Sequence, residues 1–259
     1  MDPERRPFIA GNWKMNVGGP EAAALALAVA GAVRAHDAVD VLVAPPFTAL
    51  AAVRAALDDA GSRVALGAQN MSEEADGAFT GEISSSMLRS AGVTWVLIGH
   101  SERRQKSGET DDLVAKKTAR ALTTGPRPIV CVGETLAERE AGDTLVVVAR
   151  QVRAVVEALG RQPGFGAIAY EPVWAIGTGK VASPRDAETV HASIRALLAR
   201  ASPELARSTR ILYGGSVKAD NAAELLAQPN IDGALVGGAS LDAAGFAEIV
   251  AAAQSRAQA

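Results

Sequence analysis

Apolar and polar positions along this chain follow two alternating patterns. Short runs of apolar, often β-branched residues recur, and each is followed by a longer stretch with apolar residues at helical spacing. Runs that are apolar almost throughout are typical of strands in a parallel sheet with both faces covered. Eight such strands are predicted, at residues 8–13, 39–44, 63–68, 95–99, 128–132, 167–171, 210–213 and 231–236.

The stretches between these runs are rich in Ala, Leu, Glu and Arg, which favour helices. The predicted helices include residues 20–35, 48–60, 109–123, 136–159, 184–201 and 219–227. Eight strand–helix units predict a closed (β/α)8 barrel, whereas a doubly wound open α/β sheet with the same alternation remains the alternative. The chain has 259 residues, one such barrel takes about 250, and no linker composition interrupts the sequence. We therefore expect one domain over residues 1–259.

Composition and charge exclude several classes of function. With 26 Lys and Arg against 29 Asp and Glu, the net charge is −3, so a nucleic-acid partner is not expected. The single cysteine, Cys131, excludes a disulfide framework, and the three separated histidines lack metal-ligand spacing. No apolar run approaches the roughly 20 residues that span a bilayer, and no signal peptide is recognised. We therefore expect no membrane partner and a cytoplasmic location.

Polar and glycine residues gather at the ends of the predicted strands. In a (β/α)8 barrel the catalytic groups lie where strands end and the following loops begin. The residues at these positions are Asn12, Lys14, Gln69, Asn70, His100, Glu134, Glu171, Gly214 to Ser216, Gly237 and Gly238. The pattern predicts a site at this end of the barrel.

His100 follows the apolar run 95–98 and opens a short helical turn. A histidine at the positive end of such a turn loses stability as an imidazolium, so we expect a neutral ring at pH 7. A neutral imidazole can donate one hydrogen bond and transfer one proton. An isolated histidine is more often a core residue with satisfied hydrogen bonds, but the strand-end position and the neighbouring charges favour a functional role.

Glu171 ends the sixth predicted strand, and an unusually long loop, residues 172–182, follows it. The loop begins with the stiff, apolar Pro172, Val173 and Trp174 and contains the flexible tip 177–179, a composition that suits a lid moving on short hinges. Closing such a lid would remove water from Glu171, which raises a carboxylate pKa and strengthens the group as a base. An ordinary surface loop with a solvated glutamate is the alternative.

Two glycine-rich turns, Gly214-Gly215-Ser216 and Gly237-Gly238, follow the seventh and eighth predicted strands. Loops at these two positions of a barrel often bind phosphate, because glycine lets backbone N–H groups approach an anion closely. A single Gly-Gly pair is more often a tight turn, but two on consecutive strands favour a phosphate site. Lys14 would add positive charge for an anionic substrate or a developing oxyanion.

These residues together closely resemble the triosephosphate isomerase family, and the resemblance runs from the first strand to the last. The matching stretches are residues 8–16, 77–82, 98–104, 131–134, 170–180, 213–217 and 232–240. The resemblance implies a single-domain TIM barrel that interconverts dihydroxyacetone phosphate and D-glyceraldehyde 3-phosphate without a cofactor or metal.

The resemblance also implies a role for each matching residue. Glu171 would be the base that moves a proton between adjacent substrate carbons, and His100 the neutral electrophile at the substrate oxygens. Lys14 would stabilise negative charge, and Glu102 would hold Lys14 or order the histidine loop. The expected substrate-binding residues are Asn12, Trp13, Lys14, Gly177, Ser216, Gly237 and Gly238.

A homodimer is implied as well, with Phe79 and Thr80 of one copy reaching the Lys14 region of the other. The sequence departs from the usual family pattern at 71–74, in the loop that reaches the partner, and at Lys106-Ser107, where an aromatic pair is usual.

Two other functions are weighed against the isomerase. A metal-dependent sugar-phosphate epimerase would need several His and Asp ligands at strand ends, where His100 is the single histidine. A catalytically silent phosphate-binding barrel would be expected to lack Glu171, His100 or Lys14, and all three are present.

Overall fold

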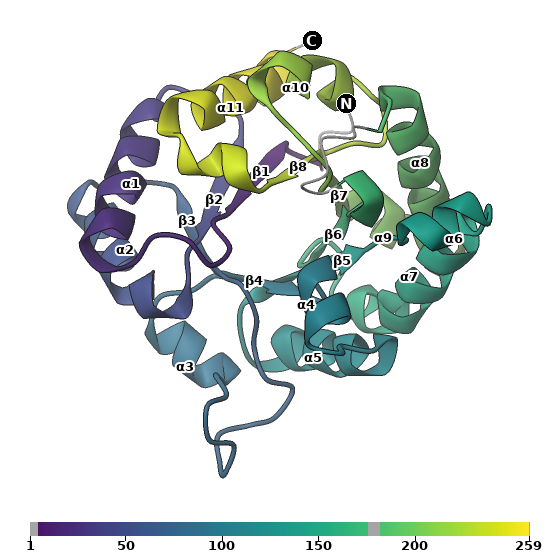
Figure 1. Cartoon of the computed structure of the whole chain (residues 1–259), viewed down its shortest axis with the longest axis horizontal. Coiled ribbons are helices and arrows are strands. Elements are labelled where there is room, and N and C mark those ends of the chain that lie inside the picture. Colours follow the sequence, from purple (N-terminus) through teal and green to yellow (C-terminus); the bar gives the residue numbers. More distant parts are fainter. Residues whose placement is uncertain (1–4, 176–181, 259) are drawn as a thin grey trace.

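The computed structural model describes residues 5–175 and 182–258. Within these residues eight parallel strands form a closed barrel in which each pairs with the next and β8 returns to β1 (Figure 1). The strands are β1 (Phe8–Asn12), β2 (Asp40–Ala44), β3 (Ala65–Ala68), β4 (Trp95–Ile98), β5 (Arg127–Val132), β6 (Ala167–Tyr170), β7 (Arg210–Tyr213) and β8 (Gly233–Val236). The closure confirms the predicted (β/α)8 TIM barrel and excludes the open sheet.

Helices surround the barrel on its outer side (Figure 1). They are α1 (Gly19–Ala32), α2 (Leu50–Asp59), α3 (Ser85–Ser90), α4 (Ser101–Lys106), α5 (Asp111–Thr124), α6 (Leu136–Glu140), α7 (Thr144–Gly160), α8 (Pro184–Ala201), α9 (Pro203–Ser208), α10 (Ala219–Leu226) and α11 (Ala243–Gln258). Short 3₁₀ turns cover Phe47–Ala49, Val173–Ala175 and Gly238–Leu241. Among the helices of the described residues, none has both the length and the apolar character that crossing a membrane requires.

The prediction of one long helix over residues 136–159 was wrong. The structure has α6 and α7, separated by a turn in which Gly142 has a φ of 82°. That backbone conformation favours glycine and ends a right-handed helix. A capping box at the start of α6, in which Thr135 and Glu138 bond each other's backbone N–H groups, fixes where it begins.

Alternate residues of each strand point into the barrel, as the period of two requires. The interior holds a hydrophobic cluster that includes Phe8 and Ala10 of β1, Ala167 and Ala169 of β6, and Leu235 of β8. The intervening residues pack outward against the helices.

The same alternation continues past the strand ends and places the functional residues. Counting on by twos from the interior positions gives Asn12 after Ala10, Glu171 after Ala169 and Gly237 after Leu235. Because all eight strands are parallel, these residues lie at one end of the barrel, above its packed interior.

His191 lies in the core and not on the outer surface of its helix. The side chain is fully buried on the barrel side of α8, where its Nδ1 lies 3.2 Å from the carbonyl oxygen of Asn230. Its ring also meets Tyr170 edge to face. The buried positions of α8 have a helical spacing of three or four residues that includes position 191, so the core takes this histidine.

The segment between β3 and α3 projects well beyond the ring of helices (the long blue loop in Figure 1). It carries Phe79, whose side chain is 45% exposed, and the exposed Thr80. At the start of the same segment Met71 and Ser72 are buried, so the part that departs from the family pattern is anchored to the barrel.

Candidate active site

A cavity of about 260 Å³ opens at the carboxyl ends of the strands. Its wall combines a carboxylate, an imidazole, two ammonium groups and both glycine-rich turns. The residues that line it are Asn12, Lys14, His100, Glu171, Gly214, Gly215, Ser216, Val217, Lys218, Leu235, Gly237, Gly238 and Ala239. Strand-end residues from distant parts of the sequence therefore meet around one cavity.

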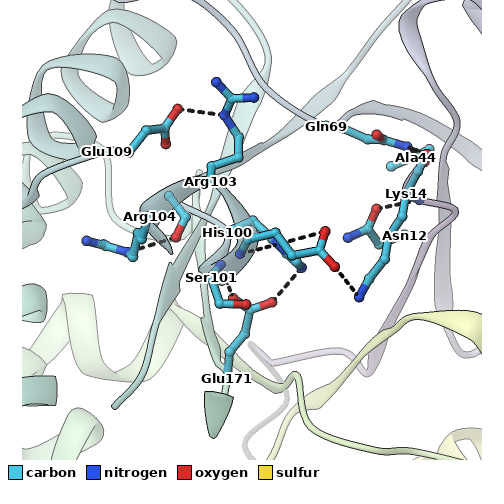
Figure 2. A network of polar contacts seen from close by, with 12 residues as sticks. Asn12, Lys14, Ala44, Gln69, His100, Ser101, Arg103, Arg104, Glu109 and Glu171 are labelled. Atoms are coloured by element: carbon cyan, nitrogen blue, oxygen red, sulfur yellow. Dashed lines mark hydrogen bonds and ion pairs between the residues drawn. The ribbon is translucent and has the colours of Figure 1, made fainter. Parts of the chain in front are cut away.

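Glu171 and His100 are in direct contact (Figure 2). Nε2 of His100 lies 2.9 Å from Oε1 of Glu171, and both side chains are buried. The backbone N–H of Ser101, at the start of α4, donates to Oε2 of the same carboxylate at 2.8 Å. Because the two functional groups touch each other, a substrate can lie between them only after one has moved.

The hydrogen bonds assign the tautomer of His100. The backbone N–H of Glu102 donates to Nδ1 at 3.2 Å, so Nδ1 accepts and a neutral ring carries its proton on Nε2, facing Glu171. Burial lowers the pKa of His100, but the carboxylates of Glu171 and Glu102 raise it by more, so the net pKa is raised. The raised pKa works against the neutral ring expected from the sequence, and moving Glu171 away would remove the larger of the two carboxylate effects while burial and Glu102 remain.

Lys14 is held at the cavity by both its backbone and its side chain. Its φ of 51° is uncommon for a non-glycine residue. The side-chain oxygen of Asn12 accepts from its N–H at 3.0 Å, and the side-chain amide of Gln69 donates to its carbonyl at 2.7 Å. Nζ of Lys14 also donates to Oε1 of Glu102 at 3.0 Å.

The pKa of Glu102 reflects this contact with Lys14. Burial raises the pKa of this carboxyl, whereas the hydrogen bond and the charge of Lys14 lower it, with a net result below the usual value. Glu102 therefore keeps its negative charge opposite the lysine near neutral pH.

The space available for a side chain differs among the glycines of the two turns. A Cβ on Gly214 would lie 2.8 Å from Cγ of Glu171, and a Cβ on Gly215 would lie 2.2 Å from the hydroxyl oxygen of Tyr213. A Cβ on Gly238 would have no atom within 4 Å. Position 214 thus leaves room for the carboxylate, while Gly238 leaves its backbone open to the cavity.

Arg104 fixes the loop that carries His100. Its guanidinium donates to the carbonyls of Gly99 and Cys131, at 2.8 and 3.2 Å, and to the Asp111 carboxylate at 2.7 Å. Gly99 has a φ of 70°, and a Cβ there would lie 2.7 Å from Val114, so only glycine fits. This arrangement sets the direction in which the chain leaves β4.

Glu134 anchors the chain after Glu171. It is fully buried and accepts hydrogen bonds from the Tyr170 hydroxyl and from Nε1 of Trp174. The guanidinium of Arg139 lies 4.1 Å above the Trp174 ring. Glu134 and Arg139 are therefore charges that hold the chain after β6 in place.

One of the residues predicted to bind substrate lies away from the cavity. Trp13 is fully buried in the hydrophobic cluster between strands and helices and does not line the cavity, so its substrate-binding assignment is corrected to a core role. The physical reason is that position 13 follows the inward-facing Asn12 and so points outward. Gly177 lies outside the described residues, as do the lid positions 176–181.

Sequence reasoning missed two contributors to the site. Gln69 had been noted as a strand-end residue without a role, yet it holds Lys14. Lys218 lines the cavity next to the first glycine turn, and its position two residues after Ser216 was the available signal. Among the described residues, no three or more His, Cys, Asp or Glu side chains are grouped to hold a metal ion.

A second cavity of about 240 Å³ adjoins the first, and Asn12, Lys14 and His100 line both. The other residues that line it are Met15, Phe47, Gln69, Asn70, Glu102, Arg103, Lys106 and Ser107. The side chain of Met15 is 94% exposed, which is unusual for a large apolar group beside a cavity. The departure at Lys106-Ser107 therefore lies on the wall of this second cavity.

Comparisons with known proteins agree with this geometry. The family model described as "Triosephosphate isomerase" matches residues 7–253. The triosephosphate isomerase of Alcanivorax borkumensis is 54% identical over 96% of this chain and 99% of its own length. The triosephosphate isomerase of Paracidovorax citrulli is 55% identical, again over 96% of this chain and 99% of its own length. The enzyme of Herpetosiphon aurantiacus is 54% identical over 95% of this chain and 98% of its own length. With a closed barrel, a carboxylate–imidazole pair and two glycine turns at its mouth, the chain belongs to the triosephosphate isomerase family.

Proposed function

We propose that this chain interconverts dihydroxyacetone phosphate and D-glyceraldehyde 3-phosphate at the cavity lined by Glu171 and His100. The observation that carries the proposal is the meeting of this carboxylate and imidazole beside a fixed ammonium group, Lys14, and two glycine turns. Moving a proton between adjacent carbons requires a base on the carbon side, a hydrogen-bond donor on the oxygen side, and stabilisation of the charge between them.

The carboxylate of Glu171 takes a proton from the carbon next to the substrate carbonyl. The bonding electrons move toward the carbonyl carbon, and the carbonyl oxygen becomes the oxyanion of an enediolate. The Nε2–H of His100 polarises that oxygen and transfers protons between the two substrate oxygens. Glu171 then returns its proton to the neighbouring carbon, so the protein is unchanged after each cycle.

The contact between the base and the imidazole sets the order of events. The substrate separates Glu171 from His100, which frees the carboxylate to approach carbon and Nε2–H to approach oxygen. Separation also moves the Glu171 charge away from His100, which lowers the pKa of the ring, while the effects of burial and of Glu102 stay. Substrate entry therefore favours the neutral imidazole that the reaction uses.

Positive charge and backbone donors hold the anionic substrate. Lys14 faces the reacting oxygens and stabilises the enediolate. Ser216, Gly237 and Gly238 donate backbone N–H groups to the phosphate, and Gly177 of the expected lid adds another. Lys218 supplies further positive charge at the same turn.

The proposal includes a homodimer. Three observations support it: the projecting loop with Phe79 and Thr80, the exposed Met15, and the second cavity beside Lys14. In such a dimer the loop of a second copy would enter that cavity and cover Met15. A cytoplasmic location and one folding domain over residues 1–259 stay predictions.

A turnover assay distinguishes the isomerase from the other two functions. The purified protein is given D-glyceraldehyde 3-phosphate in excess EDTA, and dihydroxyacetone phosphate is measured. We expect full activity under chelation. Activity that disappears with EDTA would identify a metal-dependent enzyme instead, and no turnover with or without EDTA would identify a silent phosphate-binding barrel.

A further inference from the structure

A separate cavity of about 730 Å³ lies at the other end of the barrel. The first residues of several strands line it, among them Phe8, Asp40, Ala65 and Trp95, and the end of α1 forms one wall. Since the strands are parallel, this end is opposite the one that carries Glu171. Small-molecule sites usually have volumes of about 300–1,000 Å³, so this cavity is large enough for a ligand.

The charge around this basal cavity is strongly positive. Four arginines line it, Arg6, Arg34, Arg63 and Arg127, against the single acidic lining residue Asp40. The Asp40 carboxylate is already paired, with Arg6 at 3.0 Å and with Arg210 at 2.6 Å. In residues 5–175 and 182–258, Arg34 and Arg63 form no ion pair with an acidic side chain, so their charges are free for a ligand.

Two lining residues also carry buried polar atoms without a hydrogen-bond partner. Within the described part of the chain these are Nε of Arg127 and Nδ1 of His36. Arg127 is held in place, since its guanidinium lies 4.7 Å above the Trp95 ring and donates to the Gly164 carbonyl at 3.3 Å. Buried polar atoms in proteins nearly always have a partner. A ligand with acceptor oxygens would supply one.

Much of the remaining wall is apolar. Leu27, Val33, Val39 and Val64 contribute side chains, and Phe8 lies at the barrel end of the cavity. An inorganic anion would leave this surface uncovered, whereas an apolar molecule would leave the arginines without a partner. The arginines and the apolar wall together match a ligand that has both an anionic group and an apolar body.

We propose that the basal cavity binds a small amphiphilic anion, with an aromatic or aliphatic body against the apolar wall and a phosphate, sulfonate or carboxylate group on Arg34, Arg63 and Arg127. Nothing in the isomerase reaction uses these residues, which lie a strand's length from the reacting groups. The proposed site therefore lies apart from the active site and shares no lining residue with it.

The test uses the fluorescent probe 1-anilinonaphthalene-8-sulfonate, which joins an aromatic body to a sulfonate. We expect saturable binding to the full-length protein that a mixture of the two triose phosphates does not displace. The matched uncharged probe, N-phenyl-1-naphthylamine, should bind at least about tenfold more weakly because it lacks the charge-assisted hydrogen bonds. Isomerase activity is measured in parallel.

Two variants probe the two halves of the site. Arg34→Ala with Arg63→Ala should weaken binding of the sulfonate probe by about tenfold or more. The matched control is Arg153→Ala with Arg200→Ala, two exposed arginines beside a smaller cavity between α7 and α8, which should leave binding unchanged. Neither pair touches the active site, so turnover should stay at the wild-type rate.

Gly31→Phe adds bulk at the exposed rim of the cavity without removing a charge. Gly31 lines the cavity on α1, and a Cβ there has no atom within 4 Å, so the larger side chain has room. We expect Gly31→Phe to abolish probe binding and Gly31→Ala to retain it. The two variants should give the same circular dichroism spectrum, which shows that both are folded. The proposal is overturned if Arg34→Ala with Arg63→Ala binds the sulfonate probe as tightly as the wild type, if the neutral probe binds equally well, or if triose phosphates displace the probe.

Discussion

Nε2 of His100 and Oε1 of Glu171 lie 2.9 Å apart at the mouth of the barrel, although they follow different strands, β4 and β6. This contact joins the two groups to which the proposed reaction assigns opposite tasks. While the two groups are in contact, the Glu171 carboxylate is bonded to His100, and the pKa of the imidazole is raised. The substrate therefore has to separate the two groups before both are ready for proton transfer.

Replacing the base should lower catalysis without unfolding the protein. We expect Glu171→Gln to reduce kcat by about 10²–10⁴-fold, the usual contribution of a positioned acid or base. Steady-state kinetics and a thermal melt check both parts. Glu140→Gln, at an exposed glutamate of α6, is the matched control and should keep wild-type kcat. Near-normal kcat in Glu171→Gln would remove Glu171 from the mechanism.

The same substitution should change the titration of His100. Burial lowers the pKa of His100, and the Glu171 charge raises it, so removing that charge should move the pKa downward. NMR titration of the ring in the free protein measures this, with Glu140→Gln unchanged from wild type. An equal or higher pKa for His100 in Glu171→Gln would show that the contact does not set its protonation.

Two glycines of the turns should respond differently to alanine. The Cβ of Gly214→Ala would meet Cγ of Glu171 at 2.8 Å and displace the base, so we expect a loss in kcat of roughly 10²-fold. At Gly238 a Cβ has free space, so Gly238→Ala should fold normally and mainly raise KM by hindering the phosphate. Wild-type kcat in Gly214→Ala, measured in the same assay, would contradict the spacing argument.

Removing the tip of the expected lid should change the products. We expect deletion of residues 176–179 to increase phosphate release relative to isomer, because an enediolate open to water eliminates its phosphate more often. Assays of inorganic phosphate and of both triose phosphates give the partition. If the ratio matches that of the full-length protein, the loop is not a barrier to water.

The dimer has its own test at Thr80 on the projecting loop. Thr80→Arg should weaken association and activity together, since the loop of one copy is expected to support the Lys14 region of the other. Sedimentation velocity and kinetics are compared with Thr123→Arg, at an exposed threonine on α5. A fully active monomer would show that the projecting loop has no part in the site.

The alternation of apolar runs and helical stretches was enough to predict the barrel, because strands covered on both faces leave a distinct sequence pattern. Strand starts were less certain: β3 begins at Ala65 rather than at 63, and β8 at Gly233 rather than at 231. The helices α3, α4, α9 and α11 were not singled out. The first three have only six residues each, too few for a helical period to show.

For the site, positions at strand ends were predictable, whereas contacts across the barrel were not. Sequence placed Glu171 and His100 at the same end, but their direct contact depends on side-chain rotamers and on the Ser101 N–H. The role of Gln69 depends on the φ of 51° at Lys14, which no local pattern announces. Trp13 was misplaced because a matching motif does not say which way each of its residues points.

The most direct measurement is a crystal structure of the protein with an unreactive, phosphate-bearing analogue of the triose. We expect the analogue's carbons to lie between the Glu171 carboxylate and Nε2 of His100, with the phosphate against the backbone of Ser216, Gly237 and Gly238. A complex in which Glu171 and His100 still touch each other, with the analogue bound elsewhere, would contradict it.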